Sequence, residues 1–146
     1  MSSSAQAPVA PLGVAIIQYT LRFNVTIPAN TTPYQNLFQI PVANGRKMTF
    51  TASIWFSQGS AGQVHVKLVL GQNFQTGTPL IPFINNSATL IVTGSVADYI
   101  GDNNTCYGVT PFPVTGGQII TGVGYNSDPT IAHDVTFELQ ITESPL

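Results

Sequence analysis

The chain has 146 residues, a mass of 15.5 kDa and a formal net charge of -2. Its four basic and six acidic side chains make up 7% of the residues, against about 25% in an ordinary soluble domain. Four cations give no electrostatic surface for a polyphosphate, so the composition argues against nucleic-acid binding. No apolar run approaches the roughly 18 residues of a membrane helix. The single cysteine, Cys106, excludes an internal disulfide and a cysteine zinc cage.

The first 13 residues, MSSSAQAPVAPLG, differ from the rest of the chain in composition. They combine small residues with Pro8 and Pro11, and they lack the basic start and the apolar stretch of a secretory signal. We expect residues 1–13 to form an extended arm, which either frays or orders against a neighbouring subunit. Nothing marks a boundary after residue 13, so residues 14–146 are predicted to form one domain.

Apolar and polar residues alternate along most of the chain, as they do in strands with one buried and one polar side. Alternation is clear at 17–27, 48–57, 64–70 and 135–142, and weaker at 35–42, 87–93, 105–114 and 118–125. Proline or glycine interrupts every window that could hold a helix. The sequence therefore predicts an all-β, single-domain antiparallel β-sandwich, a jelly roll of about eight strands.

Turn-forming residues separate these runs. The pair Asn44-Gly45 predicts a tight hairpin, because both residues tolerate positive φ. The pair Gly116-Gly117 predicts a second sharp reversal. Residues 71–86 alternate poorly and are expected to form an extended connection, whereas 98–104 and 126–129 are expected to form polar loops.

The segment IPVANGRKMTFTASIWFSQGSAGQVHVKLVLG resembles the middle of the jelly-roll carbohydrate-binding modules of the galactose-binding-like type. The later runs TGSVADYI, FPVTGGQIITGVGY and HDVTFELQITE are similar to the second half of that family, so the likeness covers about residues 40–142. Asp134 lies where the closing strand of the family often carries an aspartate. Tyr99 lies in the region where the family often has a tryptophan. The resemblance implies a jelly roll, glycan binding and, in many members, a structural calcium ion.

Trp55 is the main candidate for a contact residue, because it shares the polar side of its strand with Thr51 and Ser53. A tryptophan on a hydroxyl-rich sheet face suits a glycan platform or a subunit contact, and packing under residues 71–86 is the alternative. The candidate interface or glycan contacts are Trp55, Thr51, Ser53, His65, Lys67 and Tyr99.

Residues suited to catalysis are few. His65 and His133 are the only imidazoles, and on a strand His133 and its neighbour Asp134 point to opposite faces. Cys106 has no cation near it in sequence that would lower its pKa. We therefore expect a protein without enzymatic activity.

Oxygen-rich loops give a weak indication of calcium binding, from Asp98, Asp102, Asn103, Asn104 and Asp128. These residues lack the spacing of an acidic calcium loop, so no cofactor is expected, and a structural calcium ion remains the alternative.

The scarcity of charge suggests how the molecule is used. Thr, Ser, Asn and Gln cover its polar faces, and such side chains lose water more cheaply than lysine or glutamate. The composition and the arm predict a structural protein of a virion, a minor capsid, cementing, decoration or vertex protein that contacts itself or other capsid subunits. One alternative is a carbohydrate-binding module, and another is an extracellular filament subunit that donates a strand to its neighbour.

Overall fold

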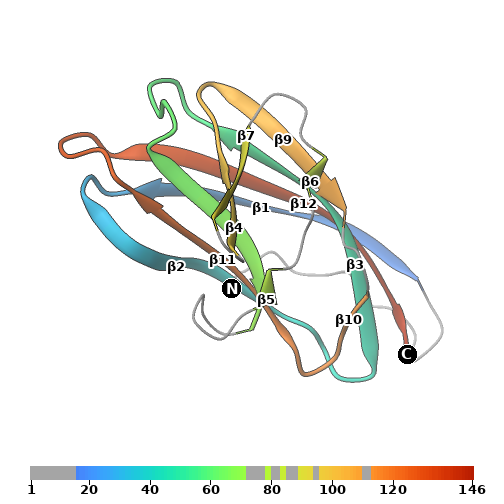
Figure 1. Ribbon diagram of the computed structural model, residues 1–146. Coiled ribbons are helices and arrows are strands. Elements are labelled where there is room, and N and C mark those ends of the chain that lie inside the picture. The colour runs from blue at the N-terminus through green and yellow to red at the C-terminus, as the bar shows by residue number, and fades with distance from the viewer. Residues whose placement is uncertain (1–15, 72–77, 80–82, 85–88, 94–95, 110–112) are drawn as a thin grey trace.

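The computed structural model describes residues 16–71, 78–79, 83–84, 89–93, 96–109 and 113–146, and all the regular structure among them is β (Figure 1). The strands are β1 (Ile17–Ile27), β2 (Thr31–Pro41), β3 (Arg46–Phe56), β4 (Val64–Leu70), β5 (Thr78–Pro79), β6 (Phe83–Ile84), β7 (Thr89–Thr93), β8 (Val96–Ile100), β9 (Asn104–Val109), β10 (Val114–Thr115), β11 (Ile119–Asn126) and β12 (His133–Pro145). None of these described segments is a helix long and apolar enough to cross a bilayer.

Two antiparallel sheets pack face to face. In the described residues, one sheet has the strand order β1-β12-β3-β9-β6 with β10 beside β3, and the other has the order β2-β11-β4-β8-β7 with β5 beside β4. The pairs β1 and β2, β3 and β4, β8 and β9, and β11 and β12 each place consecutive strands in opposite sheets. This is jelly-roll connectivity, so the fold predicted from the alternation is confirmed.

The hairpin predicted at Asn44-Gly45 is wrong. The two residues form a turn closed by the Arg46 amide on the Ala43 carbonyl (3.2 Å), but β2 and β3 on either side belong to different sheets. Gly45 has a φ of 76°, whereas Asn44 keeps a negative φ. A type I′ turn, which would fold one strand back on the next, needs positive φ at both positions. The turn instead carries the chain across the sandwich.

The loop predicted at 98–104 is also wrong over its first part. Val96–Ile100 is strand β8, which pairs with β7 over five residues and meets β4 where Tyr99 faces Val66. The turn is confined to the residues between Ile100 and Asn104. Val96, Tyr99 and Ile100 favour β structure, and pairing with two neighbouring strands accommodates Asp98, the one charged residue of this strand.

The core lies between the sheets and is formed by the inward residues of both. Phe56, Phe137, Ile54, Leu139 and Val66 are among its fully buried members. At the side where β1 and β2 form the sheet edges, the ring of Phe38 stacks on Phe23 (centroids 4.1 Å) and meets Phe137 edge-on (4.9 Å). Gly122 on β11 leaves room for the Phe38 ring, because a Cβ there would lie 2.3 Å from a ring carbon.

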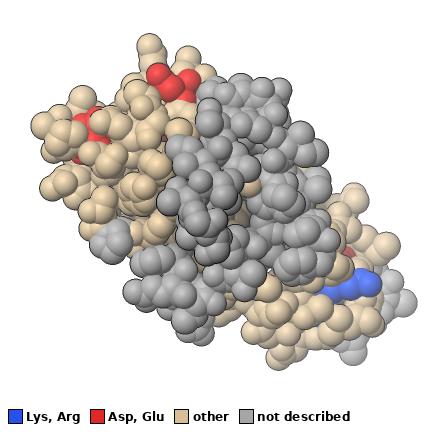
Figure 2. Space-filling view, viewed as in Figure 1, with Lys and Arg blue, Asp and Glu red and all other residues tan. Residues whose placement is uncertain are grey.

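Charged groups gather at the two ends of the sandwich. Figure 2 shows acidic atoms at one end of the molecule and basic atoms at the opposite end. The acidic end contains Asp102, which accepts a hydrogen bond from the Gly59 amide, and Asp134. The basic end contains Arg46 and Lys47 at the start of β3. Arg22 on β1, Glu138 on β12 and Lys67 on β4 lie between the two ends.

Candidate functional site

The outer side of the β1-β12-β3 sheet is a broad surface on which uncharged polar residues outnumber charged ones, here called the polar face. It follows from the alternation, since the other side of each strand is buried in the core. Its residues are Gln18, Thr20, Arg22, Asn24 and Thr26 on β1, Asp134, Thr136, Glu138, Gln140, Thr142 and Ser144 on β12, and Lys47, Thr49, Thr51, Ser53 and Trp55 on β3. The predicted shared side of Thr51, Ser53 and Trp55 is confirmed.

Cross-strand pairs occupy one half of the polar face. The Arg22 guanidinium donates to Glu138 (3.3 Å), and the Thr26 hydroxyl donates to Asp134 (2.6 Å). The Thr136 hydroxyl donates to the Asn24 amide oxygen (2.9 Å). Such exposed pairs contribute little stability, about 0–1 kcal/mol each, but they hold the side chains in fixed positions.

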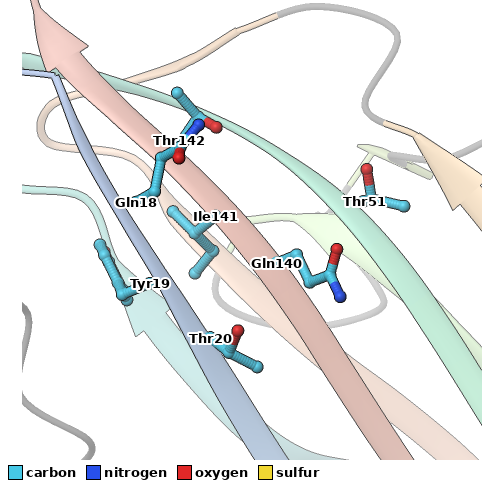
Figure 3. Close-up of a pocket in the computed structure, with 7 residues that line it drawn as sticks. All are labelled: Gln18, Tyr19, Thr20, Thr51, Gln140, Ile141 and Thr142. Atoms are coloured by element: carbon cyan, nitrogen blue, oxygen red, sulfur yellow. The ribbon is translucent and has the colours of Figure 1, made fainter.

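The other half of the polar face is a shallow depression of about 370 Å³ (Figure 3). It is lined by Gln18, Tyr19, Thr20, Thr51, Gln140, Ile141 and Thr142. Tyr19 and Ile141 are inward-pointing residues of β1 and β12, so the side-chain amides and hydroxyls come from the other five. Within the described part of the chain, these five side chains make no hydrogen bond with one another or with a neighbour. They are available to a bound partner.

Trp55 lies away from this depression. Its side chain is 39% exposed on the polar face, next to Thr136 of β12 and Thr105 of β9. It lies four positions along β3 from Thr51, about 13 Å at the rise of a strand. The aromatic surface and the depression are therefore two separate features of one face. A sugar ring lying in the depression would have no tryptophan to stack on.

His65 and Lys67 belong to the opposite sheet, on the outer side of β4. The His65 ring stacks on Tyr125 (4.5 Å), and the Lys67 ammonium lies over the Tyr34 ring (4.5 Å from its centroid). Lys67 is only 5% exposed, so the prediction that it forms part of an open contact surface is corrected. Its ammonium is buried against the Tyr34 ring, an arrangement that amphipathic lysine side chains allow. These two residues do not join Trp55 on one surface.

Tyr99 is also placed differently from the prediction. Its side chain is 2% exposed and belongs to the hydrophobic core, on the same side of its sheet as its partner Val66. A residue in that position is part of neither outer surface. The error follows from the loop assigned to 98–104, because only the strand pairing determines which side of β8 faces inward.

His133 and Asp128 form a buried pair where β11 passes into β12. The His133 ring lies 2.8 Å from an Asp128 carboxylate oxygen, and the other oxygen accepts from the amides of Thr130 (3.0 Å) and Ile131 (3.1 Å). The hydrogen bonds from the Thr130 amide and from His133 hold the pKa of the Asp128 carboxyl below its usual range. Asn126 braces the same loop by donating to the Ile131 carbonyl (2.9 Å).

The two described aspartates among the candidate calcium ligands, Asp102 and Asp128, are held by different hydrogen bonds. Asp128 uses both carboxylate oxygens within the loop, and Asp102 accepts from the Gly59 amide (2.7 Å). In the described residues, no three His, Cys, Asp or Glu side chains form a group able to hold a metal ion. The side chains of Asp98, Asn104 and Cys106 lie outside the described residues.

A buried polar cluster at the basic end of the sandwich was not foreseen from the sequence. The Tyr19 hydroxyl donates to one Glu143 carboxylate oxygen (2.8 Å), and Arg46 Nε donates to the other (3.0 Å). Burial and the hydrogen bond to Glu143 raise the pKa of the Tyr19 hydroxyl. The residues are 124 and 97 positions apart in the chain, so no local motif could indicate the contact. The cluster ties the starts of β1 and β3 to the end of β12.

Comparison of the chain with family models, with curated proteins and with solved structures finds no match. The structure supports the resemblance noted in the sequence only at the level of two antiparallel sheets packed as a sandwich.

Proposed function

We propose that the protein is a non-enzymatic structural subunit of a virion, a minor capsid, cementing, decoration or vertex protein, and that the polar face is its main packing surface. The observation that supports this proposal best is the polar face itself, which spans three strands and carries a single described ion pair, Arg22 with Glu138. Jelly rolls form the shells of many viruses, although the same fold also occurs in lectins.

The chemistry of the polar face suits burial against protein. Interface centres are depleted in charge and enriched in tryptophan, and hydroxyls and amides lose water at lower cost than ammonium or carboxylate groups. Trp55 supplies a large exposed ring, and the depression supplies hydrogen-bonding groups that have no partner in the described residues. A neighbouring subunit that packed on the polar face would bury the Trp55 ring and could hydrogen-bond to the groups of the depression.

A glycan ligand is the second candidate, and the depression favours it. Amides and hydroxyls of Gln18, Thr20, Thr51, Gln140 and Thr142 are the groups that bind sugar hydroxyls, and they converge on one hollow. In this alternative the protein is an extracellular carbohydrate-binding module of the type it resembles. The separation of Trp55 from the depression counts against the usual aromatic platform.

Assembly of the purified chain tests the first proposal. We expect the concentrated protein to form ordered particles, rings or sheets in electron micrographs, and the substitutions Thr51→Lys and Trp55→Ala to suppress them. A lysine buried at such a contact would raise the concentration needed for assembly at least about tenfold. Gln58→Lys, at an exposed position in the loop after β3, is the matched control and should assemble normally.

Two results would contradict the proposal. One is a protein that stays monomeric at every concentration and joins no shell when mixed with other capsid subunits. The other is a glycan-array signal lost in Thr51→Lys and Gln140→Ala but retained in Trp55→Ala, which would establish glycan binding in the depression instead.

A further inference from the structure

The outer edge of β1 is a long, regular and open strand edge. β1 is the terminal strand of its sheet, and its eleven residues pair with β12 in unbroken register from Ile17 opposite Glu143 to Ile27 opposite His133. Within the described chain no strand pairs with its other side. Tyr19, Phe23 and Val25 point toward the core and are only partly buried along this edge. A strand added here would gain a complete hydrogen-bond ladder and cover these side chains further.

The neighbouring edge strand shows what is missing from β1. Natural proteins protect sheet edges with prolines, bulges, charges or short strands. β2 contains Pro33, and its register against β11 shifts near Asn36 and again near Thr31. β1 contains no proline, glycine or bulge, and its one charge, Arg22, is paired with Glu138. The two edges lie on the same side of the sandwich, where Phe23 stacks on Phe38 (Figure 1).

The sequence of β1 is complementary to itself in one antiparallel register. With Leu21 opposite Leu21 of a second copy, Tyr19 faces Phe23 and Thr20 faces Arg22 across the pair, while Ile17 faces Val25. Apolar residues then meet on the core side and polar residues on the outer side, which is the requirement for a continuous sheet. The register also keeps the two Arg22 side chains from lying opposite each other, where they would repel.

We propose that β1 pairs with β1 of a second copy of this chain, forming a two-fold dimer in which the two β1-β12-β3 sheets join into one continuous sheet. A two-fold contact uses the same strand on both partners and closes on itself. The far edge of this sheet ends in β6, with two residues in the described structure, so it offers little for further growth. The inference goes beyond the proposed function, because it concerns a strand edge and not the polar face.

Opposite charges at one position test the pairing. Thr20 is exposed and faces Arg22 of the partner in the stated register, so Thr20→Lys places like charges opposite each other twice in the dimer, and Thr20→Glu places opposite charges there. In sedimentation equilibrium of the full chain, we expect a monomer–dimer equilibrium whose Kd rises about fivefold in Thr20→Lys and falls in Thr20→Glu. Gln58→Lys, at an exposed position in the loop after β3 and outside both the polar face and the β1 edge, is the matched control and should leave this Kd within about twofold.

Hydrogen exchange gives a measurement that needs no variant. Backbone amides of β1 that point away from β12 should exchange quickly in dilute protein and slowly at concentrations where the dimer forms. Concentration-independent exchange of these amides, or a monomer at all concentrations, would overturn the inference. A dimer weakened by Thr51→Lys and insensitive to both Thr20 substitutions would also overturn it, while supporting the polar face as the contact. A Kd raised equally by Thr20→Lys and Thr20→Glu would refute the register.

Discussion

Replacing Gly122 with alanine tests how the β1 and β2 side of the sandwich is packed. The added methyl carbon would lie 2.3, 2.5 and 2.8 Å from three ring carbons of Phe38, far inside contact distance. The ring cannot move freely, because it stacks on Phe23 at 4.1 Å and meets Phe137 edge-on at 4.9 Å. Relief therefore requires that one of these aromatic contacts be lost or that β11 shift.

The expected cost follows from these contacts. Overpacking a fixed core position costs about 1–3 kcal/mol, and the loss of an aromatic pair costs about 0.5–1.5 kcal/mol. We expect Gly122→Ala to lower the free energy of unfolding by about 2–3 kcal/mol, as measured by urea denaturation followed through Trp55 fluorescence and circular dichroism. Phe38→Leu alone should cost about 1.5 kcal/mol through its lost ring contacts.

The double variant separates crowding from other causes. Leucine is shorter than phenylalanine, so Phe38→Leu vacates the space that the alanine methyl needs. The combined cost should therefore fall below the sum of the single costs by at least about 1 kcal/mol, a coupling typical of residues in direct contact. Additive costs, or a Gly122→Ala variant as stable as the parent, would refute the packing derived for Phe38.

Two further predictions concern ionisable groups, and a third concerns Trp55. The folded-state pKa of Asp128 lies below its unfolded value, so the contribution of this carboxylate to the free energy of unfolding is complete above about pH 4 and is lost as the pH falls through the folded pKa. Compared with the parent protein, Asp128→Asn should therefore lose less stability on acidification, as measured by urea titrations from pH 2 to 6. The raised pKa of Tyr19 has the opposite effect on stability, so the free energy of unfolding should fall as the pH rises above about 10. Tyr19→Phe should weaken this alkaline loss and should cost about 1–2 kcal/mol near neutral pH. Trp55, the only tryptophan, should be quenched by acrylamide in the isolated molecule and protected in the assembled form; equal quenching in both would place it outside the contact.

Much of the local structure is readable from the sequence. The runs at 17–27 and 64–70 coincide with β1 and β4, and the polar side of β3 is correctly assigned to Thr51, Ser53 and Trp55. These features depend on a period of two, which each strand carries in its own residues. The shared face of β1, β12 and β3 needed the register as well, and the register joins residues more than a hundred positions apart.

Features that depend on which strands become neighbours were not readable. Lys67 has the spacing of an exposed residue, yet it is buried under Tyr34, and Tyr99 lies in the core because β8 pairs with β4. Asn44-Gly45 has the composition of a hairpin, yet it crosses between sheets. Local chemistry permits several turn types and either face, and packing selects among them.

Alternating side chains were enough to determine an all-β chain in which β1, β3 and β12 turn one side toward solvent, because the alternation lies within each strand's own sequence. The order of strands decided the rest: which polar residues line the depression, how Tyr19, Arg46 and Glu143 come together, and that no other described strand pairs with the outer edge of β1. Those outcomes depend on which distant segments pair as strands. That pairing is stabilised only once the two sheets have formed, so no local sequence pattern specifies it.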